Sequence, residues 1–142
     1  NGYYILDNYG TVYPYGDAVP FGNANLELGL ARDIELMPDG KGYLILDAYG
    51  LVHGFGSGQP LAESLQRNDA PIGSVRNIPQ FDTRLASDLE IHRNGSTGTV
   101  DGWWILEIHG KIINVGLAPI PIVRHPMGEE FTYRDLEKYP SQ

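Results

Sequence analysis

Five aromatic or imidazole side chains are the best candidates for contact with a ligand: Tyr9, Tyr49, His109, Tyr13 and His53. A tyrosine ring has an apolar face and a polar tip, so it can stack on a sugar and also hydrogen-bond to it. An imidazole can act as a general base or bind a metal. No two of the four histidines have metal-ligand spacing, such as four residues apart on a helix. These residue types therefore indicate either a binding surface without a metal or ordinary packing in strands and turns.

Two series of acidic residues recur along the chain and could serve acid–base or metal chemistry. The first comprises Asp7, Asp47 and Glu107, and the second comprises Asp33, Asp88 and Asp135. Carboxylates that ring a channel can bind a hard cation, and two at a fixed separation can hydrolyse a glycoside. Nothing in the sequence singles out one pair, and an Asp beside a turn caps that turn. We therefore expect Asp7 and Asp47 to cap their turns and the second series to hold hydrogen bonds between strands.

The sequence lacks the motifs of covalent catalysis and of phosphate binding. Its six serines include no Gly-x-Ser-x-Gly elbow, and it contains no cysteine. The glycine-rich stretch 54–58 lacks the lysine of a phosphate loop. The sequence therefore predicts a non-catalytic protein, with no catalytic residue, no metal and no cofactor.

The elements that position the candidate residues come from an internal repeat. A glycine–aromatic phrase occurs at 2–10, 42–50 and 102–110, and each copy continues alike to 16, 56 and 116. A second phrase, built on Asp and a nearby Glu, occurs at 31–35, 86–90 and 133–137. Two phrases that each recur three times in the same order indicate tandem repeats. We expect one repeat domain over 1–142, with repeats at about 1–41, 42–101 and 102–142 and an inserted segment at about 57–80.

Each repeat is predicted to contain at least three antiparallel strands. Aromatic and β-branched residues between glycines predict strands at 3–7, 43–47 and 103–107. A turn ending in glycine, which accepts a positive φ, leads each into a second strand at 11–15 and at the equivalent positions. The Asp phrases form third strands, and weaker segments at 25–29 and 119–123 are candidates for a fourth. Residues 60–68 are a candidate for one short helix.

The first strands of the repeats are predicted to be covered on both faces. Their apolar residues at 3–6, 43–46 and 103–106 do not alternate with polar ones, as expected for strands buried on both sides. The blades of a β-propeller are antiparallel sheets of this kind, with a period of about 40–50 residues. The sequence therefore predicts an all-β fold of three propeller-type blades.

Residues 31–53 strengthen this prediction through a family resemblance. They read Ala-Arg-Asp-Ile-Glu-Leu, then Pro-Asp-Gly, then Gly-Tyr-Leu-Ile-Leu-Asp. This segment resembles a tandem Gly/Tyr-rich β-propeller repeat of secreted and surface-associated bacterial proteins, similar in size to WD40 blades. The third copy departs from the pattern, with Trp103 and Trp104 for the tyrosine pair and Ile113 in place of His53. The resemblance implies the fold and an extracellular or cell-surface location, and it carries no catalytic motif.

Three blades are fewer than the four or more that close a propeller. We therefore expect either a fragment of a longer propeller protein or a ring completed by other chains, with two chains giving six blades. A filament is the lesser alternative, because head-to-tail contacts that do not close produce one. An open sector of three blades exposes two blade faces and free strand edges, which favours association.

Composition excludes several other partners. The 142 residues carry a net charge of −8 without a basic stripe, which disfavours nucleic acid and anionic membranes. No apolar stretch is long enough for a membrane span. The sequence therefore predicts a non-catalytic, extracytoplasmic β-propeller module for protein–protein interaction or self-assembly. The alternatives are a carbohydrate-binding propeller, in which Tyr15 would add to the tyrosine platform, and part of a propeller glycoside hydrolase or lyase.

Overall fold

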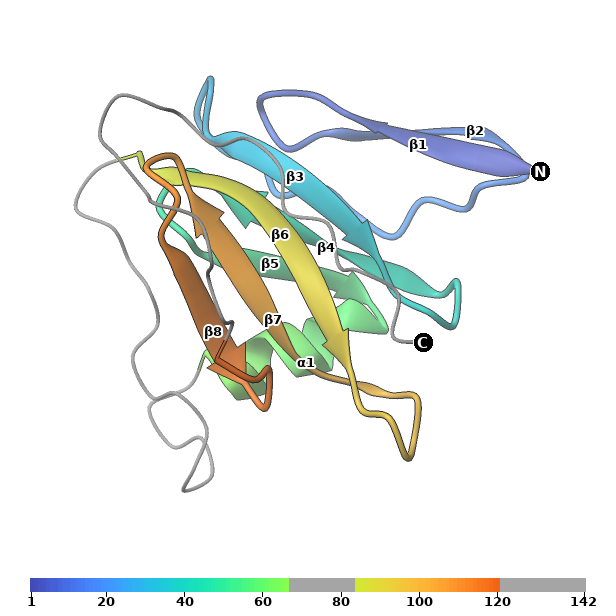
Figure 1. The fold of residues 1–142 in the computed structure, drawn as a ribbon. Helices are drawn as coiled ribbons and strands as arrows, with labels where there is room; N and C mark the ends of the chain where they lie inside the picture. The colour runs from blue at the N-terminus through green and yellow to red at the C-terminus, as the bar shows by residue number, and fades with distance from the viewer. Residues whose placement is uncertain (67–83, 121–142) are drawn as a thin grey trace.

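The computed structural model describes residues 1–66 and 84–120, which form an all-β arrangement with one short helix (Figure 1). In chain order the elements are β1 (Gly2–Leu6), β2 (Val12–Gly16), β3 (Ala31–Leu36), β4 (Gly42–Asp47), β5 (Val52–Gly56), α1 (Gly58–Leu65), β6 (Ala86–Arg93), β7 (Val100–Glu107) and β8 (Ile112–Gly116). They make three antiparallel sheets with the strand orders β1-β2, β3-β4-β5 and β6-β7-β8. We refer to these as the first, second and third sheets.

The three sheets contain hairpins of equivalent register. Gly2 pairs with Gly16, Gly42 with Gly56 and Gly102 with Gly116, and the pairing continues in step along each hairpin. In the second and third sheets, a strand with the Asp phrase pairs with the other edge of the hairpin. Both of these added strands have a register shift just before the Asp. The predicted hairpins and the Asp strands at 31–35 and 86–90 are therefore confirmed, and the phrase at 133–137 lies outside the described residues.

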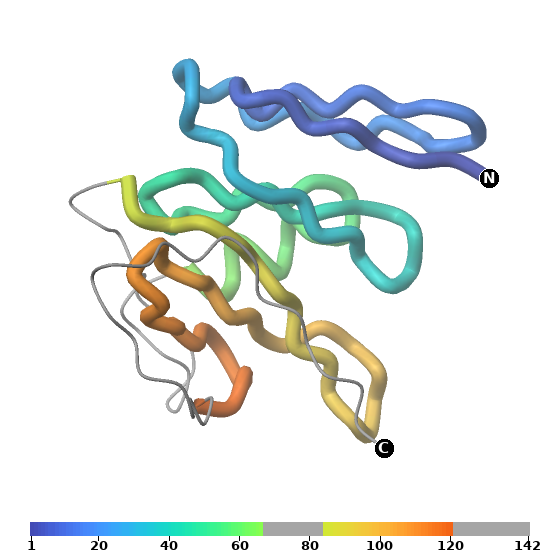
Figure 2. Tube along the Cα trace, turned by 45° about the horizontal axis from the view of Figure 1, so that its top comes forward, coloured from blue at the N-terminus to red at the C-terminus, as the bar shows by residue number. Residues whose placement is uncertain are grey.

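The second sheet lies between the other two (Figure 2). Tyr43 and Ile45 on β4 point toward the first sheet, where they form a core cluster with Val12. Leu44 and Leu46 point the other way, into a larger cluster with residues of the third sheet. All four side chains are fully buried. Strand β4 is thus covered on both faces, as its unbroken apolar sequence predicts.

Strand β1 does not have the same environment as β4. Its inner residues Tyr4 and Leu6 pack against the Tyr43 cluster. Its outer residues Tyr3 and Ile5 are exposed, so the prediction that 3–6 is buried on both faces is wrong for the described part of this chain. The reason is that no other described sheet lies on that side (Figure 1).

Helix α1 packs at the edge of the contact between the second and third sheets, where Ala62 belongs to the core cluster. It can lie directly on β5 because residue 54 is a glycine; a Cβ there would collide with the carbonyl group of Gly58. The candidate helix at 60–68 is therefore present, beginning two residues earlier and ending at Leu65.

The candidate fourth strand at 25–29 is wrong, because this segment contains no strand. Its amides bond to the turn of the first sheet instead, with Leu26 N donating to Tyr9 O over 2.8 Å. Asn25 also has a positive φ of 50°, which interrupts an extended chain. Of the other candidate, 119–123, the described residues 119 and 120 are not in a strand, and the rest lie outside the described residues.

Candidate functional site

The hairpin turns are held by the acidic residues of the first series. Asp7 Oδ1 accepts hydrogen bonds from the amides of Tyr9 and Thr11, at 2.9 and 2.8 Å. Asp47 Oδ1 makes the equivalent bonds, at 2.9 Å to the Tyr49 amide and 3.1 Å to the Leu51 amide. The prediction that Asp7 and Asp47 cap their turns is confirmed. Tyr9 and Tyr49 are thereby placed at the turn tips, where their side chains are exposed.

The remaining carboxylate oxygens bind the other three candidate residues. Asp7 Oδ2 accepts from the Tyr13 hydroxyl at 3.1 Å, and Asp47 Oδ2 lies 2.9 Å from His53 Nε2. In the third hairpin Ile113 stands where the histidine would be, and the carboxylate changes partner. Glu107 Oε1 lies 2.7 Å from Nδ1 of His109, at the turn tip. The five candidates thus divide among three separate turns, each with its own carboxylate.

The pair formed by Asp7 and Tyr13 shifts the pKa of both groups. Desolvation raises the pKa of Asp7, but hydrogen bonds from the Thr11 and Tyr9 amides and from the Tyr13 hydroxyl together outweigh it, so this pKa lies below its ordinary value. The hydrogen bond to Asp7 and the negative charge of its carboxylate raise the pKa of Tyr13. At neutral pH the carboxylate is therefore charged and the phenol is neutral, which is the state that the hydrogen bond requires.

His53 lines a shallow cavity of about 410 Å³ between β5 and α1. The cavity also contains Gln59, Glu63 and Gln66. Gln66 is occupied by the strand edge, because its amide group bonds to both N and O of Val52, at 2.9 and 2.7 Å. The lining offers one imidazole and one carboxylate to a ligand but no hydroxyl or thiol nucleophile. Within residues 1–66 and 84–120, no three potential ligand side chains come close enough together to hold a metal ion.

A second cavity, of about 480 Å³, lies where the turn after β3 meets the start of α1 and the β6–β7 turn. Met37, Leu61 and Val100 supply its apolar lining. Asp39 borders it and is held by the Lys41 amide and the Ser57 hydroxyl, which lower the pKa of its carboxyl group. Its carboxylate is thus used in fixing the turn.

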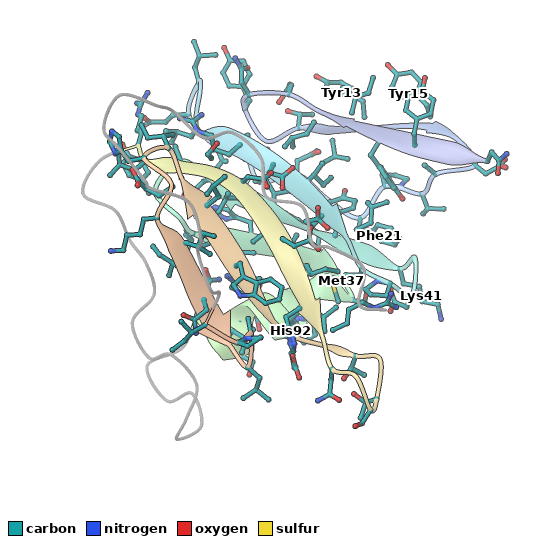
Figure 3. All side chains as sticks on the ribbon, in the orientation of Figure 1. Tyr13, Tyr15, Phe21, Met37, Lys41 and His92 are labelled. Carbon is teal, nitrogen blue, oxygen red and sulfur yellow. The ribbon has the colours of Figure 1, made fainter. Side chains whose placement is uncertain are left out.

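The outer face of the first sheet departs from the internal symmetry of the described residues. Tyr3, Ile5, Tyr13 and Tyr15 share this face, because Tyr3 pairs with Tyr15 and Ile5 with Tyr13 across the hairpin. Figure 3 shows Tyr13 and Tyr15 on the side of the hairpin that faces away from the other sheets. The rings of Tyr3 and Tyr15 are stacked, with centroids 5.1 Å apart. We call these four residues the open face.

The counterparts of the open face in the other sheets are buried. Tyr3 and Ile5 are 59% and 48% exposed, whereas Tyr43 and Ile45 at the same register positions are 0% exposed. In the third sheet Trp103 and Ile105 are 1% and 0% exposed. Each buried pair is covered by the sheet that precedes it in the chain. The open face is therefore the same type of surface without its cover.

The first sheet also has an open edge. Its outer strand β2 is capped where Asn23 Oδ1 accepts from the Val12 amide at 2.8 Å, just as Gln66 caps β5 at Val52. The other edge is β1. The corresponding edges of β4 and β7 carry β3 and β6, but among the described residues no strand pairs with this edge of β1. A strand edge of this kind is a template for pairing with another chain.

Sequence reasoning names Tyr13 and Tyr15 but does not single out Tyr3 and Ile5. Nothing in their local sequence distinguishes them from Tyr43 and Ile45, which occupy the same places in the glycine–aromatic phrase. No described helix has the length and apolar character needed to cross a membrane. Comparisons of the chain with models of protein families, with curated proteins and with solved structures find no match.

Proposed function

We propose that this chain is a non-catalytic β-propeller-type module for protein–protein interaction, and that it assembles with further copies of itself through the open face. The observation that carries the proposal is the contrast between Tyr3 and Ile5, which are exposed, and Tyr43 and Ile45, which are fully buried. A contiguous exposed aromatic and aliphatic patch on a sheet is typical of an interaction surface. The occupant that fits it best is a sheet like the one that covers β4.

The contact between successive sheets supports a propeller-type arrangement. The strands with the Asp phrase, β3 and β6, lie side by side (Figure 1). Asp33 Oδ2 on β3 accepts from the Leu89 amide on β6 at 3.1 Å, and Arg32 Nε donates to Ala86 O at 3.1 Å. The Ala86 amide donates to Ala48 O, and the Ala31 amide donates in the same way to Asn8 O of the first sheet. A set of contacts that repeats from one sheet to the next can continue into another copy of the chain.

The energetics of covering the open face favour association. Full burial of a large apolar side chain is worth about 1.5–3 kcal/mol. Four such side chains, each now about half exposed, therefore offer several kcal/mol on docking, before the entropic cost of association is subtracted. None of the four side chains of the open face is charged, and the neighbouring carboxylate of Asp7 is bound by Tyr13. The docked face would thus bury no unpaired charge.

One further part of the proposal rests on sequence and another on hydrogen bonds in the structure. The resemblance of 31–53 to repeats of secreted and surface-associated bacterial proteins supports an extracytoplasmic location. Against an enzymatic role, Asp7, Asp47 and Glu107 each bond within their own hairpin, so none of them faces another across a cleft.

The native mass as a function of concentration tests the proposal. We expect light scattering of the full chain to give multiples of 15.7 kDa that grow or saturate with concentration. The double variant Tyr3→Ser/Ile5→Ser should remain at the monomer mass at concentrations where the unchanged chain is associated. Leu28→Ser, at an exposed position outside the open face, is the control and should associate normally. A monomer mass for the unchanged chain at every concentration would contradict the proposal.

The exposed rings also favour a second candidate, a carbohydrate-binding module. The stacked pair Tyr3 and Tyr15 presents a flat aromatic surface of the kind that holds a sugar ring. A glycan array separates the two functions. Binding of a glycan that is lost in Tyr15→Ser would support the second candidate, and absence of binding to every glycan would reject it.

A further inference from the structure

We propose that the second cavity binds a small organic ammonium ion, with its apolar body against Met37, Leu61 and Val100 and its charged group at Asp39. The cavity lies at one end of the second and third sheets, where the turn after β3, the start of α1 and the β6–β7 turn meet (Figure 1). Its described lining includes none of the four residues of the open face. The proposal therefore concerns a second site and goes beyond the proposed self-assembly.

The size and lining of the cavity suit a small organic molecule. Its volume of about 480 Å³ falls within the range of about 300–1,000 Å³ that is typical of ligand pockets. Met37, Leu61 and Val100 also pack against the core cluster of the second and third sheets, so the apolar wall is continuous with the core. The described polar side chains of the lining are one carboxylate and three hydroxyls, from Asp39, Ser57, Thr97 and Thr99. A mostly apolar wall with a few polar groups is the usual composition of a pocket for a small molecule.

Two of the three walls come from segments that interrupt the internal repeat. Leu36 pairs with Tyr43, seven positions further on, whereas the equivalent Ile91 pairs with Trp103, twelve positions further on. The longer connection in the third sheet supplies residues 97–99 of the lining. Helix α1 likewise has no counterpart between β2 and β3. Because insertions between repeats often carry the binding surface, we interpret this cavity as a feature separate from the repeated sheet pattern.

The β6–β7 turn is held in shape by its own hydrogen bonds. Asn94 Oδ1 accepts from the amides of Ser96 and Thr97, at 2.9 and 3.2 Å, and the Gly98 amide donates to Asn94 O at 2.8 Å. The hydroxyl oxygens of Thr97 and Thr99 are 2.7 Å apart. A Cβ on Gly98 would meet no heavy atom within 4 Å, so the space beside this residue is open. This wall is therefore fixed before a ligand arrives, which lowers the entropic cost of binding.

The carboxylate at the rim of the cavity selects a cation. Asp39 Oδ1 accepts from the Lys41 amide and from the Ser57 hydroxyl, both at 2.8 Å. These bonds hold the pKa of Asp39 below its ordinary value, so the carboxylate is charged at neutral pH. No other described residue hydrogen-bonds to Oδ2. One oxygen therefore fixes the turn, and the other is an acceptor for the N–H groups of a ligand.

Lys41 is the positively charged residue beside this carboxylate, and it does not bind it. Its charge contributes to the lowered pKa of Asp39, but within the described residues the two side chains form no ion pair. An ammonium ligand gains a charge-assisted hydrogen bond to Asp39 that a neutral alcohol lacks. A carboxylate ligand is repelled by the same charge. The expected order of affinity is thus ammonium, then alcohol, then carboxylate.

Isothermal titration calorimetry of the full chain with three probes of similar size tests this order. Phenethylamine, phenethyl alcohol and hydrocinnamate share an aromatic ring and differ in charge. We expect saturable binding of phenethylamine with a dissociation constant of about 1 mM or lower. The alcohol should bind at least tenfold more weakly, and hydrocinnamate more weakly still. No saturable binding of phenethylamine, or equal affinity for phenethylamine and hydrocinnamate, would overturn the proposal.

A peptide probe distinguishes two sources of the same chemistry, because a peptide amino terminus is also an ammonium group. Phe-Gly-Gly is titrated with a free and with an acetylated amino terminus. Tighter binding of the free peptide than of phenethylamine, lost on acetylation, would assign the site to a peptide terminus. Weaker binding of the free peptide would assign it to a free amine. Equal binding of the free and acetylated peptides would contradict recognition of the ammonium group.

Matched substitutions locate the site. Asp39→Asn removes the charge and keeps an oxygen for the two hydrogen bonds of the turn. It should weaken phenethylamine binding at least tenfold and leave phenethyl alcohol binding unchanged. Glu63→Gln, in the cavity beside His53, and Tyr3→Ser/Ile5→Ser, on the open face, are the controls and should bind phenethylamine normally. Loss of binding in a control while Asp39→Asn binds normally would place the ligand elsewhere and contradict the proposal.

Amide chemical shifts give a readout that does not depend on a variant. Phenethylamine should shift the amide resonances of residues 97–99 and of Leu61, which line the cavity. Resonances of residues 52–55, beside the other cavity, should stay in place. Shifts confined to residues 52–55 or to the open face would overturn the assignment, whatever the affinity.

Discussion

Three isoleucines occupy equivalent positions in the three hairpins, and their substitution tests which sheet faces are covered. Ile5, Ile45 and Ile105 occupy the same place in β1, β4 and β7. Ile45 and Ile105 are 0% exposed and lie between sheets, whereas Ile5 is 48% exposed. Replacement of each by alanine makes the same chemical change in three environments. We expect the loss in free energy of unfolding to depend on the neighbouring sheet rather than on the strand.

The magnitudes follow from burial. Ile45→Ala and Ile105→Ala each leave a cavity inside a core cluster and should lower the free energy of unfolding by about 2–5 kcal/mol. Ile5→Ala leaves no cavity in a dilute, monomeric chain, because water already reaches half of the side chain. Its cost there should be about 1 kcal/mol or less. In the assembled state the covered Ile5 should contribute about 1.4 kcal/mol more, so Ile5→Ala should weaken association roughly tenfold.

Urea unfolding at two protein concentrations, followed by tryptophan fluorescence, measures these differences. The buried indole of Trp103 reports the interface between the second and third sheets. For Ile45→Ala and Ile105→Ala we expect a large loss at both concentrations. For Ile5→Ala we expect a small loss in dilute solution that grows at high concentration, since association stabilises the folded chain by mass action. A loss in dilute solution as large as that of Ile45→Ala would contradict this expectation, because Ile5 would then be covered within one chain.

Three further predictions concern single contacts. Tyr43→Phe should lower the free energy of unfolding by about 1–3 kcal/mol, because the buried hydroxyl accepts from Gly22 N at 3.0 Å and donates to Gly22 O at 2.6 Å. Tyr4→Phe is the control, because the hydroxyl bond of Tyr4 is exposed, and it should leave urea unfolding nearly unchanged. Asp7→Asn should lower the pKa of Tyr13 toward the ordinary value, because the charge and acceptor that raise it are removed; NMR titration of selectively labelled tyrosine checks this, and an unchanged pKa would rule out the pair. Gly54→Ala should displace α1 from β5 and lower the melting temperature, and an unchanged melting temperature would contradict the close helix–strand contact.

The pKa shift of Asp7 also sets the sign of a pH effect. Its pKa is lower in the folded chain than in the unfolded one, so its contribution to stability is present above the unfolded value and is lost as the pH falls through the folded value. The opposite holds for Tyr13, whose raised pKa gives a contribution that is present below the unfolded value and lost as the pH rises through the folded one.

The hairpins were predictable because their signals are local. A glycine–aromatic run, an Asp that caps a turn and a glycine with positive φ act within about ten residues, and Gly10, Gly50 and Gly110 indeed have φ of 79°, 85° and 88°. The segment 25–29 was misread for a non-local reason. Its amides bond to the turn of the first sheet, a contact that strand propensity does not contain.

The residue types of the candidate site could be predicted from the sequence, but which of its side chains are exposed could not. The sequence names Tyr13 and His53 as candidate residues and separately predicts that Asp7 and Asp47 cap their turns. The structure adds that each candidate bonds to one of these carboxylates. Tyr3 and Tyr43 lie in nearly the same local sequence, yet one is exposed and the other is buried. Burial of these residues depends on whether another sheet packs against their face, so local sequence could not distinguish them.

The accessibility of a thiol on the open face shows whether this face is covered when chains associate. Ile5→Cys would be labelled with a maleimide at increasing protein concentration, beside Leu28→Cys, which is exposed outside the open face. We expect labelling at position 5 to slow at least tenfold as the chains associate, while labelling at position 28 keeps its rate. Equal and constant rates at both positions over the whole concentration range would contradict the claim that the open face is a docking surface.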